Sequence, residues 1–114
     1  MSEKWDKYLK GLLVKGLVDE RMLAGVANAR KLPHGEYGFC LMCLKGSTLN
    51  LYHTNVKQEV GELLYTLDLK KVENLKTSAF VLNSFIKFTY EGYDYKLVDC
   101  IFKELYDAIK SESK

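Results

Sequence analysis

The feature that most constrains the fold is a two-residue period of apolar side chains, which begins near Tyr37 and continues through most of the remaining chain. Such alternation places one set of side chains on a single face of a β-strand. In the stretch FIKFTYEGYDYKLV it runs on both sides of a two-residue turn at Glu91-Gly92. This turn predicts a hairpin whose facing residues form one apolar surface: Tyr90 with Tyr93, Phe88 with Tyr95 and Ile86 with Leu97. The same register sets Lys87 against Lys96.

A second hairpin is predicted in the stretch YGFCLMCLKGSTLNLYHTN. A turn at Gly46-Ser47 places Leu44 opposite Leu49 and gathers the aliphatic side chains on one face. The following stretch, GELLYTLDLKKVENLKTS, predicts one or two more strands with an interruption around residues 68–71. We therefore expect about seven strands between two helices, which is an α+β chain that is mainly β.

The two predicted helices lie at the ends of the chain. Ser2 is a candidate cap for an N-terminal helix that extends to Lys15, and Gly16 is a candidate stop. Asp99 is a candidate cap for the C-terminal helix. The C-terminal helix carries an apolar stripe at helical spacing: Phe102, Leu105, Tyr106 and Ile109.

Local rules leave the segment from Asp19 to Ala29 open between helix and strand. Its alanine content and the cap at Asp19 favour a helix, whereas its position before Pro33 and Gly35 favours a first strand.

Length and composition describe one soluble domain of 114 residues with a net charge of only +2. A dedicated nucleic-acid binder is usually much more basic, so we expect no nucleic acid as a partner. The lysines and acids near the N-terminus interrupt any signal peptide, and the odd number of cysteines is typical of a reducing compartment. We therefore expect a cytoplasmic protein.

Motifs for chemistry are scarce. Cys40 and Cys43 form a Cys-x-x-Cys pair, but in a strand they point to opposite faces about 10 Å apart, beyond the reach of a disulfide. A zinc site that combines Cys40, His53 and Cys100 lacks a second closely spaced ligand pair. No nucleophile elbow, phosphate loop or metalloprotease motif occurs in the sequence. We expect no enzyme activity, no cofactor and no metal.

Two short stretches offer an alternative function, an RNA-binding module. Tyr37-Gly38-Phe39 resembles the core of the RNP1 motif of RNA-recognition motifs, and LLVKGL from Leu12 resembles RNP2. Leu13 stands where RNP2 requires an aromatic ring. About twenty residues between the two motifs also cannot contain the helix and the strand that this fold requires.

The stretch ARKLPHG places three candidate ligand-binding residues, Arg30, Lys31 and His34, in one short loop. Lys45, Lys87 and Lys96 can add positive charge nearby. Such a cluster can hold a lipid phosphate or an acidic peptide. A solvated loop with no ligand is the alternative.

Four stretches carry a resemblance to a known family: DERMLAGVANA, GFCLMCLKGSTLNLYH, YTLDLKKVENLK and FIKFTYEGYDYKLVD, the last before a closing helix. Together they resemble the pleckstrin-homology-like (PH-like) superfold, and within it bacterial PH and GRAM-type domains. The stretch Lys45-Gly46-Ser47 departs from the family pattern because it lacks the usual threonine before the turn.

The resemblance implies a PH-like domain over residues 19–114, with residues 1–18 as a helical extension. It implies a barrel of two bent antiparallel sheets, capped at one open end by the C-terminal helix, with a first strand in the segment from Asp19. The function it implies is a non-catalytic binding or assembly module that contacts a protein partner or an anionic lipid head group.

The N-terminal helix carries apolar residues on one side that need a cover in a soluble protein. We expect this side either to pack on its own barrel or to form an interface in self-association. Its residues are Trp5, Leu9, Leu12 and Leu13.

Overall fold

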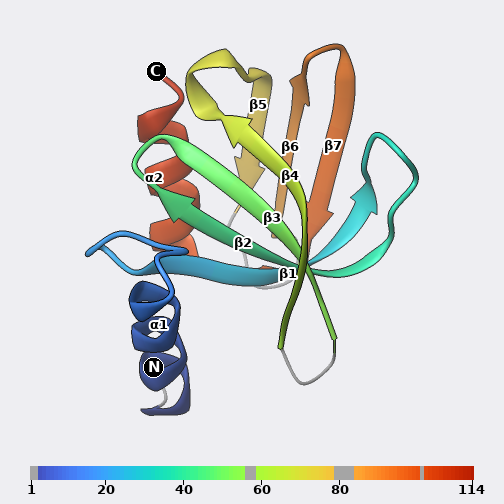
Figure 1. The fold of residues 1–114 in the computed structure, drawn as a ribbon. Helices are drawn as coiled ribbons and strands as arrows, with labels where there is room; N and C mark the ends of the chain where they lie inside the picture. Colours follow the sequence, from blue (N-terminus) through green and yellow to red (C-terminus); the bar gives the residue numbers. More distant parts are fainter. Residues whose placement is uncertain (1–2, 56–58, 79–83, 101) are drawn as a thin grey trace.

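The computed structural model describes residues 3–55, 59–78, 84–100 and 102–114, and within them seven strands lie between two helices (Figure 1). The helices are α1 (Glu3–Val14) and α2 (Lys103–Glu112). A short 3₁₀ turn, η1 (Leu69–Lys71), forms the expected interruption between the fourth and fifth strands. The strands are β1 (Leu23–Lys31), β2 (Gly38–Lys45), β3 (Thr48–Thr54), β4 (Val60–Asp68), β5 (Glu73–Ser78), β6 (Phe85–Tyr90) and β7 (Tyr93–Val98).

All seven strands belong to one antiparallel sheet with the order β4-β3-β2-β1-β7-β6-β5. β1 pairs with β2 from Leu23 to Ala29, but with β7 only from Asn28 to Lys31, across a bulge. β1 therefore joins a four-stranded portion to a three-stranded portion, and Figure 1 shows the strands of the two portions running in different directions. The expected barrel of two bent sheets is corrected to a single sheet that does not close, because β4 and β5 are its two edges.

Both predicted hairpin registers are confirmed. Phe88 faces Tyr95 and Lys87 faces Lys96 in the β6–β7 hairpin, and Leu44 faces Leu49 in the β2–β3 hairpin. Glu91 and Gly92 have φ values of +51° and +83°. Both signs match a type I′ turn, which fits the twist of the hairpin even though Glu is a poor residue there.

The main core lies between the inner faces of the two portions and α2. Phe88 and Tyr95 stack there with ring centroids 4.8 Å apart, so these rings are core residues. Leu105, Tyr106 and Ile109 of α2 are buried in the same cluster, as the apolar stripe predicts.

The predicted cap of α2 is wrong. The helix follows Phe102, which caps it without a side-chain hydrogen bond, and Asp99 lies upstream with a φ of +66°. Asp99 instead accepts a hydrogen bond from the amide of Asn28, 3.2 Å away, and so ties the end of β7 to β1. The proposed cap of α1, Ser2, lies outside the described residues.

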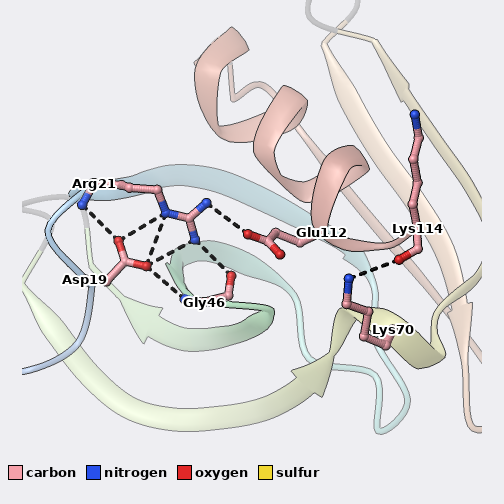
Figure 2. A network of polar contacts seen from close by, with 6 residues as sticks. All are labelled: Asp19, Arg21, Gly46, Lys70, Glu112 and Lys114. Carbon is pink, nitrogen blue, oxygen red and sulfur yellow. Dashed lines mark hydrogen bonds and ion pairs between the residues drawn. The ribbon is translucent and has the colours of Figure 1, made fainter.

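The ambiguous segment is a strand from Leu23 onward, while Asp19 to Met22 form the turn that precedes it. Figure 2 shows how this turn is held. Asp19 accepts the backbone N–H groups of Arg21 and Gly46, each at 2.9 Å, and Arg21 donates to Glu112 at 3.0 Å. One network thus joins the turn before β1, the β2–β3 turn and the end of α2.

α1 packs on the outer face of its own sheet, on the side of β1 and β2 opposite α2. Leu9 and Leu12 are buried in a second apolar cluster with Leu41, Cys43 and other residues of the sheet. Gly16 ends the helix as predicted, with a φ of +76°. Residues 3–18 and the sheet therefore share a cluster of buried side chains.

Candidate anion-binding surface

The structure places the three predicted ligand-binding residues in two elements and gives each a different contact. Arg30 and Lys31 are the last two residues of β1 and not part of a loop. The guanidinium of Arg30 lies 5.8 Å from the ring centroid of Tyr37 and donates to its hydroxyl at 3.0 Å. His34 lies beyond them in the β1–β2 turn and stacks on Tyr65.

The surroundings of His34 are acidic. The hydroxyl of Tyr65 donates to one oxygen of Glu36 at 2.6 Å, and the backbone N–H of His34 donates to the other at 3.1 Å. Burial alone would raise the pKa of Glu36, but these hydrogen bonds lower it below its ordinary value. Burial and the hydrogen bond to Glu36 raise the pKa of Tyr65 to about 12. Glu36 is therefore a carboxylate at neutral pH, and its charge opposes an anion at His34.

Lys31, by contrast, belongs to a row of lysines that crosses four neighbouring strands. Strand pairing places lysines directly opposite one another from β5 to β1, and all of them are exposed. We call these residues the lysine row: Lys76 on β5, Lys87 on β6, Lys96 on β7 and Lys31 on β1.

The row concentrates positive charge on the outer face of the sheet. Neighbouring strands lie about 4.8 Å apart, and like charges directly opposite each other destabilise a sheet. Lys31 has a partial partner in Asp94, whose carboxylate lies 3.6 Å from its ammonium group, with both side chains largely exposed. In the described parts of the chain, Lys76, Lys87 and Lys96 form no ion pair. An anion near the row would therefore relieve repulsion between its members.

The sequence patterns predict part of this surface. Lys87 and Lys96 do add charge beside Lys31, whereas Lys45 lies at the β2–β3 turn and donates to the carbonyl of Gly16 at 3.3 Å. The sequence patterns do not indicate Lys76, because only the pairing of β5 with β6 places it beside Lys87.

The predicted interface residues divide into two groups. Leu9 and Leu12 are buried against the sheet, and Trp5 stacks on Phe102 with ring centroids 5.0 Å apart. Leu13 is 36% exposed. Two arrangements were expected for this side of α1, packing on its own chain or self-association. The structure shows the side packed on the chain's own sheet.

The cysteines are buried, and Cys40 and Cys43 lie in different apolar clusters on opposite faces of β2, as the alternation predicts. Burial raises the pKa of each of these two thiols to about 12, so both are neutral and poor nucleophiles at neutral pH. Cys40 is paired with His53 across the strands. Among the described residues, no group of three or more His, Cys, Asp or Glu side chains could hold a metal ion.

The two RNP-like stretches differ in structure. Phe39 lies on β2, but Leu12 to Val14 form the last turn of α1, so the RNP2-like stretch is not on a neighbouring strand. The stacked rings of Phe88 and Tyr95 face the core, where no base can reach them.

No protein-family model matches the chain, and no curated protein matches it either. In the described residues, neither helix has the length and apolar content needed to cross a bilayer. The fold and the lysine row together define a small β-sheet domain with one basic face.

Proposed function

We propose that this chain is a non-catalytic binding module with PH-like architecture, which engages an anionic partner through the lysine row. The observation that carries the proposal is the direct lateral pairing of Lys76, Lys87, Lys96 and Lys31 on one exposed face.

The PH-like part of the proposal rests on the division of the sheet. A four-stranded and a three-stranded portion meet at β1 and enclose the core, and α2 covers part of it. This arrangement is similar to the two bent sheets and closing helix that the sequence resemblance implies. The open edges at β4 and β5 and the helix α1 are features of this chain that the resemblance does not include.

The charge arrangement favours binding over catalysis. Lysine ammonium groups attract anions as point charges, and a group of them raises the local anion concentration. The described residues supply little that could carry out a reaction, because the thiols of Cys40 and Cys43 are buried and Glu36 is occupied by hydrogen bonds.

The test is retention of the purified full chain on a polyanionic matrix such as heparin, eluted with salt. The row variant replaces Lys31, Lys76, Lys87 and Lys96 with Gln. Its matched control replaces four other exposed lysines, which are scattered over α1, η1 and α2, with the same change in net charge: Lys7, Lys10, Lys71 and Lys110.

We expect the row variant to elute at clearly lower salt than the control, because binding by several clustered cations depends steeply on salt. The row variant should be at least as stable to urea as the parent, since removing like charges from opposite positions relieves repulsion. Equal elution of the two variants would contradict the proposal.

A further inference from the structure

The outer face around the lysine row has an ordered pattern on either side. On one side, two residues along β6 and β7 and three along β1, lies a row that is mostly apolar and continues onto β2. It comprises Phe85 on β6, Val98 on β7, Asn28 on β1 and Phe39 on β2, each directly opposite the next. On the other side lies a polar row, in which Thr89 donates to Asp94 at 2.9 Å.

The apolar row is accessible to a partner. Phe39 is 41% exposed, while Phe85 and Val98 are half-buried. Residues two apart on a strand are about 7 Å apart, so the long lysine side chains can reach across the apolar row or away from it. Cations beside exposed aromatic and aliphatic groups are typical of surfaces that lie at a membrane interface.

We propose that this outer face docks on a bilayer that contains anionic lipids, with the lysine row against the phosphate groups and Phe39 at the interface. This inference rests on the proposed function and names the source of the anion. The lysine row spans four strands, and its lysines line neither the cavity of about 150 Å³ beside Trp5 nor the cavity of about 210 Å³ beside Tyr37. We therefore expect the row to contact an extended charged surface and not a small ligand in a pocket.

Three observations favour a bilayer over nucleic acid as the extended anion. The row contains only lysines, which lack the forked donors of arginine that read phosphates and guanine edges. The stacked rings of the β6–β7 hairpin are turned into the core. The net charge of +2 is also small for a protein that binds mainly by neutralising phosphates along a strand.

The attraction between the lysines and the anionic lipids determines how much the affinity for the membrane should fall when the lysine row is removed. A lysine near an anionic membrane surface contributes about fivefold in affinity, which corresponds to about 1 kcal/mol. Loss of the whole row should therefore weaken binding about a hundredfold or more at low salt, and the effect should shrink as salt screens the surface.

The experiment is sedimentation of the full chain with vesicles made of equal parts phosphatidylcholine and phosphatidylglycerol, compared with vesicles of phosphatidylcholine alone. We expect binding to the mixed vesicles only, lost in the row variant and largely kept in the scattered-lysine control. Equal binding to both kinds of vesicle, or by both variants, would overturn the inference.

A second pair of variants tests the apolar contact. Phe39→Ser should weaken vesicle binding several-fold even at high salt, because its contribution does not depend on charge. Val14→Ser is the control, since Val14 is 87% exposed on α1, away from the row. Equal effects of the two substitutions would overturn the assigned orientation. Urea unfolding of each variant verifies that it is folded.

The result separates this inference from the proposed function. Row-dependent binding to heparin or to a single-stranded oligonucleotide, without binding to mixed vesicles, would overturn the bilayer as partner and leave the anion-binding function standing. Failure to bind any of these probes would overturn both.

Discussion

Gly25 lies on the inner face of β1, where α2 approaches the sheet. A Cβ atom built at this position would lie 2.7 Å from Sγ of Cys100 and 3.0 Å from Cδ2 of Leu105. Contacts this short require the buried side chains of Cys100 and Leu105 to shift, so the absence of a side chain at Gly25 allows them to pack this closely on β1.

We therefore expect Gly25→Ala to destabilise the protein by about 1 to 3 kcal/mol, as overpacked core substitutions do. Gly11→Ala is the matched control, because Gly11 lies in α1 and its Cβ would meet no atom within 4 Å. That change should stabilise the protein by up to about 1 kcal/mol, through the higher helix propensity of Ala. Urea unfolding measures both, and an unchanged midpoint for Gly25→Ala would show that α2 is not held this closely.

At the scale of elements, Asp19 fixes the turn before β1 to the β2–β3 turn, and Arg21 extends the link to α2 (Figure 2). Burial alone would raise the pKa of Asp19, but the hydrogen bonds from Arg21 and Gly46 lower it below its ordinary value of 3.8. A carboxyl whose pKa is lower in the folded state stabilises the protein above its unfolded pKa. This contribution is lost as the pH falls through the folded value.

Asp19→Asn should therefore reduce the free energy of unfolding by about 1 kcal/mol at neutral pH, and by less below about pH 3. Urea unfolding of both proteins at about pH 7, 5 and 3 tests this sign, with the difference unchanged between the first two values. A difference that is constant down to the lowest pH would mean that the charge of Asp19 does not contribute.

The elements also show which parts of the fold can be predicted from sequence patterns. Alternation and turn residues predicted the β2–β3 and β6–β7 hairpins with their registers, because each hairpin depends on contacts that are local in sequence. The junction of β1 with β7 could not be predicted in this way, because it joins Asn28 to Val98 and forms only when the whole sheet assembles. For the same reason Lys31 was recognised as a candidate, but its alignment with Lys96, Lys87 and Lys76 was not.

At the scale of the whole molecule, the two helices pack on opposite faces of the sheet, and a ring contact joins α1 to the residue before α2. Trp5 of α1 stacks on Phe102 at the start of α2, beside the part of β1 that has no β7 partner. The Cα radius of gyration is 12.9 Å, close to the value of about 13 Å that a compact chain of this length has. α1 is thus integrated into the compact fold, where it covers the outer face of β1, β2 and β3.

Two adjacent leucines of α1 test this integration. Leu12 is 2% exposed and packs on the sheet, whereas Leu13 is 36% exposed. Leu12→Ala should destabilise the chain by about 2 to 5 kcal/mol, because it leaves a cavity between α1 and the sheet. Leu13→Ala should stay within about 0.5 kcal/mol of the parent in urea unfolding, as surface substitutions usually do.

Light scattering on the same two variants separates packing within the chain from self-association through α1. If α1 serves only its own sheet, Leu13→Ala leaves the mass in solution unchanged at every protein concentration. If α1 instead contacts a second copy through its exposed side, Leu13→Ala lowers the mass. The decisive comparison is between the two leucines, because the sheet holds Leu12 and a second chain could reach only Leu13.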